Sequence, residues 1–278
     1  MVGHSVVEVC RKKRTKQHSL DEAVALSFRD FSVDMPGERI KNINLDIYRG
    51  EIIGVAGLSG HGKLALGNGV FGIYPSSGQV LLDNRELDTA NTAEVIKKGI
   101  YLLPDDRRQA GLLAARSILD NIIFTAVQQK NEFLKPLFLK GLSFIDRKKS
   151  FAYTNQCIKK FDIRCQDVKQ KVGFLSGGNQ QKVCLARAVT MRPSILFVAE
   201  PTRGVDIGAK EIILEILLNI NQMLGTTIIL ASSELGELKR VCDRIAVMYE
   251  GEIFDIFLPE CDDLEFTLAF SGERLTAE

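Results

Sequence analysis

The sequence predicts an α/β domain built on a mainly parallel sheet, with an antiparallel β subdomain and an inserted helical subdomain. Three observations indicate this class. Short apolar segments alternate with helical ones toward the end of the chain, which is typical of parallel strands covered by helices. A glycine-rich loop, residues 57–62, joins one apolar strand to a helix. The chain has 278 residues, 45% of them apolar, which is enough for one large domain with a sizeable core.

The first part of the chain predicts a linker followed by antiparallel strands. Residues 1–22 are polar and basic without periodicity, and we interpret them as the remnant of an interdomain linker. Their basic run at 11–14 fits a solvated linker, with an interaction patch as the alternative. The domain begins at residue 23, where apolar alternation sets in. The expected elements are strands at 24–28, 40–47, 51–56 and 79–82, a turn at Pro36 and Gly37, and a helix from the glycine-rich loop to Phe71.

The middle of the chain, residues 117–170, has mostly helical patterning and no convincing strand, so we expect the helical subdomain there. A helix at 92–98, closed by Gly99, and a strand at 100–103 precede it. Alternation of strand and helix resumes afterwards. The expected elements are strands at 195–198, 227–230 and 244–249, and helices at 209–224 and 235–241. We expect the domain, 23–258, to be followed by a C-terminal tail, 259–278.

Charge, cysteines and hydropathy exclude several classes of function. The net charge of +1 argues against a nucleic-acid-binding surface. Six cysteines form no CxxC pair, so we interpret them as reduced core residues of a cytosolic protein rather than metal ligands. No apolar run reaches the roughly 18 residues of a membrane span, and no signal peptide opens the chain. Any membrane association is therefore expected to be indirect, through a partner.

The glycine-rich loop has the GxxxxGK spacing of a phosphate-binding P-loop. Its glycines let consecutive backbone N–H groups surround a phosphate chain, and the following helix adds its positive N-terminus. Lys63 is expected to reach the β- and γ-phosphates. A tight turn between strand and helix is the alternative interpretation. The expected nucleotide-binding residues of this segment are Gly57, Ser59, Gly60, His61, Gly62, Lys63 and Leu64.

Two later segments identify the family. Residues 175–182 read LSGGNQQK and open a predicted helix, and residues 199–206 read AEPTRGVD after a predicted strand. In this order behind a P-loop, they resemble the signature motif, the second Walker motif and the D-loop of ABC ATPases. The likeness covers about residues 23–251 and implies a P-loop NTPase fold of the ABC type with ATP as ligand. The residues that it assigns to nucleotide here are Ser176, Gly177, Gly178, Asn179, Gln180 and Asp206.

The resemblance also implies partners. ABC domains work as head-to-tail pairs, so a second nucleotide-binding domain is expected to place its γ-phosphate against Ser176 and the signature amides. LSGGNQQK, EPTRGVD and residues 104–108 are most similar to the C-terminal half of tandem ATPases that serve ribose, galactose, xylose or nucleoside importers. We therefore expect such a half, either from a split gene or as a shortened tandem chain. It would bind a transmembrane permease at the cytoplasmic face of the membrane.

Two departures from the family pattern concern Mg²⁺. Leu64 stands where a P-loop serine or threonine ligates the metal, and Ala199 stands where an aspartate holds the metal's water shell. Glu200, the expected base that activates water, is present. Without these ligands, turnover should suffer more than nucleotide binding, and Mg²⁺ should bind only weakly. The alternative is that Ser59 or water supplies the missing ligation.

Three further positions differ from a working ATPase. Ser233 stands where the switch histidine belongs, Asp105 where the Q-loop glutamine belongs, and Met35 near the place of the adenine-stacking aromatic. We interpret His61 as a solvent-facing loop residue, with a catalytic role as the alternative. The sequence therefore predicts a degenerate site of its own and an intact signature that completes a partner's site. The isolated chain is expected to hydrolyse ATP weakly or not at all.

Two other functions compete with an energy-coupling subunit of an importer. One is a soluble ABC protein of translation or DNA repair, which the absence of a long coiled-coil insertion and of a basic surface disfavours. The other is a non-catalytic nucleotide-binding module that regulates a partner's ATPase, which strong hydrolysis by the isolated chain would reject. In relatives, the helical subdomain receives a helix of the permease. Residues 133–138 fit either such a contact or core packing.

Overall fold

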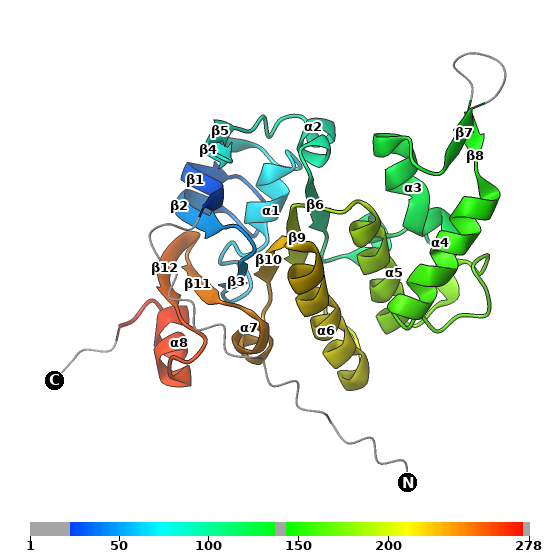
Figure 1. The fold of residues 1–278 in the computed structure, drawn as a ribbon. Coiled ribbons are helices and arrows are strands. Elements are labelled where there is room, and N and C mark those ends of the chain that lie inside the picture. Colours follow the sequence, from blue (N-terminus) through cyan, green and yellow to red (C-terminus); the bar gives the residue numbers. More distant parts are fainter. Residues whose placement is uncertain (1–22, 137–142, 275–278) are drawn as a thin grey trace, which may run out of the picture.

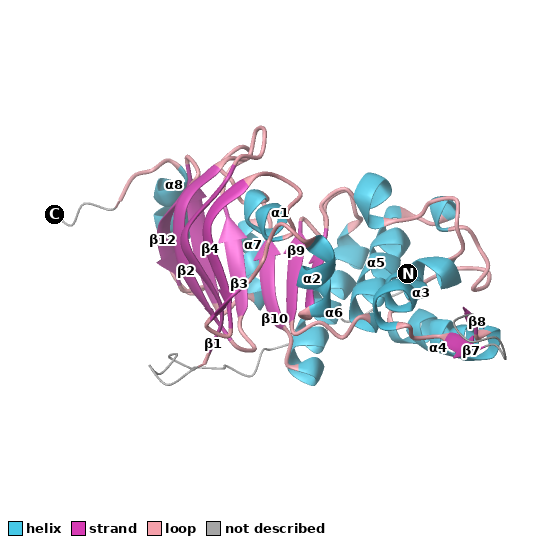
Figure 2. Ribbon diagram, turned by 90° about the horizontal axis from the view of Figure 1, so that it is seen from above, coloured by secondary structure: helices cyan, strands magenta, loops and turns pink. Residues whose placement is uncertain are grey.

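The computed structural model describes residues 23–136 and 143–274. The expected linker with its basic run lies outside the described residues, as do 137–142 and 275–278. Two larger sheets lie on one side of the folded molecule, and a helical subdomain lies on the other (Figure 1). Seen from above, the helical subdomain again lies at the end of the molecule opposite to these two sheets (Figure 2).

The antiparallel subdomain is a four-stranded sheet in the order β2–β1–β4–β5. Strand β1 (Val24–Val33) pairs with β2 (Ile40–Tyr48) on one side and with β4 (Ser76–Leu82) on the other. The short β5 (Arg85–Glu86) extends the sheet beyond β4. The predicted turn at 36–37 is present between β1 and β2. This turn lies beside the glycine-rich loop, to which it is hydrogen-bonded.

The central sheet has six strands in the order β12–β11–β3–β10–β9–β6, and neighbours from β11 to β6 run parallel. Only β12 pairs antiparallel, at the edge. The mainly parallel sheet predicted from the sequence is therefore confirmed. The strand bounds are β3 (Ile52–Ala56), β6 (Ile100–Leu103), β9 (Ile195–Ala199), β10 (Thr227–Ala231), β11 (Arg244–Tyr249) and β12 (Glu252–Phe257).

Alternate residues of the central strands face two different cores. Ile52 packs in the core under helices α5 (Gly177–Thr190), α6 (Ile207–Leu224) and α7 (Leu235–Val241). Its neighbour Ile53 packs in a second core, against the antiparallel sheet and helix α1. Because both faces of the sheet are covered, every one of the five residues in each of β3, β9 and β10 is buried. Burial on both faces explains why parallel strands are continuous apolar runs in the sequence.

Three short elements complete the part around this second core and the loop that follows it. Helix α1 (Ala65–Val70) is shorter than expected, because residues 63 and 64 are still in a turn. Helix α2 (Thr92–Lys97) is capped by the side chain of Asn91, and its Val95 is buried in the second core. A π-helical turn, Arg107–Gly111, follows β6 and begins the path into the helical subdomain.

The helical subdomain holds α3 (Ile118–Lys130) and α4 (Arg147–Lys160), and a 3₁₀ turn (Val172–Phe174) leads from it to α5. Ser117 and Asp120 form a capping box at the start of α3, which fixes where that helix begins. The expectation that this region has no strand is wrong. A two-stranded hairpin, β7 (Leu134–Pro136) and β8 (Ser143–Ile145), joins the helices. Strands of three residues are too short to show an alternating pattern, and Pro136 in β7 argued against a strand there.

The segment interpreted as a C-terminal tail contains helix α8 (Asp263–Phe270). Asp262 and Glu265 form its capping box, and Phe266 and Ala269 are buried in the main core. The five cysteines within the described ranges are in the thiol form, and Cys157, Cys184 and Cys242 are buried. Among the described residues, no helix has the length and apolar character needed to cross a membrane.

Candidate nucleotide-binding site

The glycine-rich loop connects β3 to α1 and passes close to the turn between β1 and β2. Gly62 has a φ of +99°, a conformation that side chains rarely adopt. A Cβ atom on it would lie 2.4 Å from Ile40 Cγ2 and 3.0 Å from the Arg39 carbonyl oxygen. Glycine at this position is therefore required both by the backbone conformation and by the approach of β2.

Lys63 and Glu200, predicted from separate motifs, form a buried ion pair. Lys63 Nζ lies 3.7 Å from Glu200 Oε1, and the exposed fractions of the two side chains are 3% and 8%. Ser233 Oγ donates a hydrogen bond to the same carboxylate oxygen. The backbone of Glu200 has a φ of +43°, an unfavourable conformation for a residue with a side chain. The loop lysine, the expected base and the residue at the switch position thus meet at one point.

A residue that the sequence analysis did not single out, Glu38, fills the loop. Its carboxylate accepts a hydrogen bond from the Gly60 N–H at 2.9 Å (Oε1) and another from the Gly62 N–H at 2.8 Å (Oε2). The residue is buried, with 8% of its surface exposed. Nothing in its local sequence distinguishes it, because the contact depends on how the turn between β1 and β2 packs against the loop.

Leu64 and Ala199, the positions expected to support Mg²⁺, line one small cavity together with Lys63. The rest of its lining is apolar and includes Leu66, Leu102 and Phe197. Neither side chain offers an oxygen, although Mg²⁺ prefers oxygen ligands. Within the described ranges, no group of three or more His, Cys, Asp or Glu residues is placed to hold a metal ion. The side chains at 64 and 199 therefore do not fit metal ligation.

Three other predicted residues, in the loop and after β6, differ in how far they are exposed. Ser59 is exposed at the tip of the loop, and Asp105 is half-buried after β6. The interpretation of His61 as solvent-facing is wrong. Its ring is half-buried and meets Tyr249 edge-on at 5.3 Å between centroids, and its Nδ1 is buried. The packing arises because the loop lies against the end of β11, which the sequence could not reveal.

The signature residues gather at the start of α5, on a cavity of about 310 Å³. Ser176 is the N-cap residue, and its Oγ accepts a hydrogen bond from Asn179 Nδ2 at 2.9 Å. Asp206 caps α6 by accepting from the Ala209 N–H and lines the same cavity as Ser176 and Gly178. Gln180 differs from the prediction, because its side chain is buried and donates to the Val172 carbonyl oxygen at 3.3 Å.

Arg107 links the signature to the D-loop, and it too was missed as a functional residue. Its Nη1 donates to the Arg203 carbonyl oxygen at 2.8 Å, and its Nη2 donates to the Gly204 carbonyl oxygen at 3.3 Å. A Cβ atom on Gly177 would lie only 2.6 Å from Arg107 Nη2. The first signature glycine therefore makes room for this guanidinium. The motif at 104–108 was visible in the sequence, but the role of its arginine was not.

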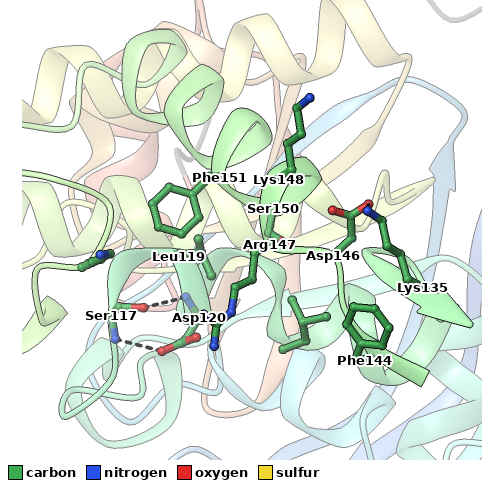
Figure 3. A pocket seen from close by; sticks show the side chains of 12 residues that line it. Ser117, Leu119, Asp120, Lys135, Phe144, Asp146, Arg147, Lys148, Ser150 and Phe151 are labelled. Atoms are coloured by element: carbon green, nitrogen blue, oxygen red, sulfur yellow. Dashed lines mark hydrogen bonds and ion pairs between the residues drawn. The ribbon is translucent and has the colours of Figure 1, made fainter. Parts of the chain in front are cut away.

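The helical subdomain carries two further cavities beside its hairpin. The larger, about 1100 Å³, contains basic side chains such as Arg147 and Lys148 as well as Phe144 and Phe151 (Figure 3). A neighbouring apolar cavity of about 230 Å³ is lined by residues of α3 and by Leu113 and Ile145. Phe144 and Ile145 remain exposed to 51% and 42%. This end of the molecule thus offers apolar surface bordered by positive charge.

A parallel sheet whose glycine-rich loop leads into a helix, with a lysine against a strand-end glutamate, defines the class of P-loop NTPases. Residues 40–203 match the model of the family described as ABC transporter. The chain belongs to the ABC transporter family, and its fold is that of an ABC cassette.

The chain resembles several import proteins. It is 38% identical over 255 residues to the ribose import ATP-binding protein RbsA of Lactococcus lactis subsp. cremoris, covering 91% of this chain and 48% of that protein. It is 35% identical over 246 residues to the xylose import ATP-binding protein XylG of Moorella thermoacetica, covering 86% and 46%. The chain therefore spans about half the length of the curated relatives that it matches.

Solved structures support the fold. The cbiO1 protein from Clostridium perfringens, part of the ABC transporter complex cbiONQ, aligns with a TM-score of 0.69 at 24% identity, over 90% of this chain and 93% of that one. A dimeric structure of the bacterial ABC transporter cassette MJ0796 aligns with a TM-score of 0.68 at 23% identity, over 85% and 100%. At these identities the likeness concerns the fold alone.

Proposed function

We propose that this chain is the ATP-binding, energy-coupling subunit of a bacterial importer for simple sugars or nucleosides. Its relatives are named as ribose and xylose import ATP-binding proteins, which supports the substrate class. The chain would act as one half of a pair. Its own P-loop would hold nucleotide without hydrolysing it well, and its signature would complete the competent site of the other half.

The contrast between the two halves of the site carries this proposal. On the P-loop side, apolar side chains occupy both positions from which Mg²⁺ would be supported, Leu64 and Ala199. On the signature side, Ser176, Gly178 and Asn179 line an accessible cavity at the start of the 14-residue helix α5. Free N–H groups at a helix N-terminus favour an anion, such as the γ-phosphate of a partner's nucleotide.

A transmembrane permease is the second proposed partner. The apolar surface of the helical subdomain, around Phe124, Phe144 and Ile145, supports this assignment because exposed apolar patches mark sites of protein contact. Docking there would hold the chain at the cytoplasmic face of the membrane. A regulatory nucleotide-binding module, the alternative function, would share the poor turnover but would not need this contact.

The test restores the missing metal ligands. Wild-type chain is expected to bind ATP almost equally with and without Mg²⁺ and to show negligible turnover. The double variant Leu64→Thr/Ala199→Asp supplies a hydroxyl and a carboxylate as metal ligands. Mg²⁺ should then tighten the binding of ATP to this variant about tenfold, which corresponds to about 1.4 kcal/mol of binding free energy. Titration calorimetry with and without Mg²⁺ measures this.

The matched control is Leu64→Ala, which removes the leucine without supplying an oxygen and should remain indifferent to Mg²⁺. Strong Mg²⁺-dependent turnover by the wild-type chain alone would contradict the proposed degenerate site. It would also reject the regulatory module. A chain that binds nucleotide but does not couple to a permease would instead favour the regulatory module.

A further inference from the structure

The phosphate-binding groups of the glycine-rich loop are already occupied by carboxylates of the chain itself. The Gly60 and Gly62 N–H groups donate to the two oxygens of Glu38, at 2.9 and 2.8 Å. The loop lysine, Lys63, lies 3.7 Å from Glu200. Backbone amides and a lysine are the groups by which a P-loop cradles phosphates. Both kinds of group therefore have an internal anionic partner.

Glu38 is held in this position by the fold around it. Its own N–H donates to the Met35 carbonyl oxygen at 3.0 Å, which closes the turn between β1 and β2. Ile40 and the Arg39 carbonyl lie so close to Gly62 that any side chain there would clash. The turn and the loop are thus packed together, and the carboxylate is buried rather than free in solvent.

A carboxylate and a nucleotide phosphate cannot share these amides. Both are anions, and two like charges a few ångströms apart in a partly buried site repel strongly. A hydrogen bond between a charged acceptor and a peptide N–H is also stronger than one between neutral groups. Nucleotide binding through this loop must therefore displace Glu38 and pay for breaking its two hydrogen bonds.

We propose that Glu38 is an internal ligand of the glycine-rich loop, which competes with nucleotide phosphates and sets the affinity of this site. The inference rests on the proposed function, in which the loop binds ATP. It identifies a residue that controls how readily nucleotide enters. In the free chain Glu38 takes the place of a phosphate group, and bound nucleotide drives it out of the loop.

The test compares Glu38→Gln and Glu38→Ala with wild type in the full chain. Glutamine keeps the shape but loses the charge and one of the two acceptor oxygens, because its amide nitrogen only donates, and alanine removes both acceptors. ATP should bind at least about tenfold more tightly to the alanine variant, because a hydrogen bond to a charged group contributes at least this factor. The glutamine variant should lie between. Titration calorimetry with ATP, and separately with pyrophosphate as the anion, measures both affinities.

Asp34→Asn is the matched control. Asp34 belongs to the same turn and carries the same charge, but its side chain is exposed and is paired with Arg39 at 2.6 Å. This variant should bind ATP within about twofold of wild type, because its side chain bonds Arg39 rather than the loop amides. Amide hydrogen exchange without nucleotide provides a second measurement. The Gly60 and Gly62 amides should both exchange faster in Glu38→Ala, and at least one of them in Glu38→Gln, whereas both should keep the wild-type rate in the control.

The outcomes separate this inference from the proposed function. Unchanged or weaker ATP affinity in both Glu38 variants, with wild type still binding ATP, overturns the role of Glu38 and leaves ATP binding intact. Tighter pyrophosphate binding without any ATP binding supports Glu38 as the loop ligand and overturns the nucleotide assignment. No binding of either anion by any variant overturns both. If the alanine variant fails to fold, the isosteric glutamine variant decides.

Discussion

A single side chain, that of Arg107, holds the D-loop in place. Its two hydrogen bonds go to backbone carbonyls of residues 203 and 204, so no change of the D-loop side chains would remove them. Replacing Arg107 with alanine should speed amide exchange over 203–206 by roughly five- to tenfold, since a net hydrogen bond contributes about 1 kcal/mol. Hydrogen exchange followed by mass spectrometry measures this change.

Arg108→Ala is the control for that prediction, because Arg108 is adjacent and exposed. Nucleotide affinity at the chain's own loop should be unchanged in both variants, since neither side chain belongs to that loop. Equal exchange rates in Arg107→Ala and wild type would mean that the D-loop is held by other contacts. A Cβ atom at Gly177 would lie 2.6 Å from Arg107 Nη2, so Gly177→Ala should push the guanidinium away from the D-loop.

Helices α4 and α5 are joined through a half-buried tyrosine, and this contact predicts a pH dependence. Tyr153 on α4 donates to Thr190 Oγ1 on α5 at 3.1 Å. Burial raises the pKa of Tyr153 from 10.0 to about 12. The folded state thus favours the neutral phenol more than the unfolded state does. Its contribution to stability is complete below pH 10 and is lost as the pH rises toward 12.

Tyr153→Phe should therefore make stability fall less steeply above pH 10 than in wild type. At neutral pH the variant should lose about 1 kcal/mol, the contribution of one hydrogen bond. Urea unfolding at a series of pH values measures both effects, with Tyr74→Phe, at a partly buried tyrosine beside the second core, as the control. Burial also raises the pKa of Cys157 and of Cys184 to about 11 each, so some alkaline loss should remain in the variant. Parallel pH curves for variant and wild type would contradict the prediction.

At the level of elements, the sequence predicted what depends on local pattern. The strands at 100–103 and 244–249 and the helix at 235–241 have the bounds expected for them. The helix expected at 209–224 is also present as α6, and its Leu214 and Leu217 are buried in the core. The hairpin β7–β8 was missed because three-residue strands have no period. Helix α8 was missed because eight residues give only one short apolar face.

The sequence pointed to those residues of the candidate site that lie in recognisable motifs. Lys63 and Glu200 were expected from separate segments, and the fold brings them together. Glu38 could not have been found in this way, because its partners are backbone amides 22 and 24 residues further along the chain. Backbone partners leave no trace in residue types. The contact exists only because the turn between β1 and β2 packs against the loop in three dimensions.

The whole molecule contributes one half of each of two composite sites, if it works as the proposed pair. The half of the Lactococcus lactis ribose import relative that this chain does not cover is the natural companion for a test. Mixed with it, this chain should stimulate ATP hydrolysis, and the stimulation should depend on the signature rather than on this chain's own P-loop. Ser176→Arg, which fills the signature cavity, should reduce the stimulated rate at least about a hundredfold, as losing a phosphate-stabilising group does.

Lys63→Ala provides the opposite arm of that experiment. It removes the lysine of a loop whose metal positions are Leu64 and Ala199, so it should leave most of the stimulated rate intact. The rate is followed by phosphate release, and association by sedimentation, so that a lost contact is not mistaken for lost chemistry. If Lys63→Ala abolishes the stimulated rate while Ser176→Arg spares it, the working site is this chain's own P-loop. The asymmetry argued from Leu64 and Ala199 is then reversed.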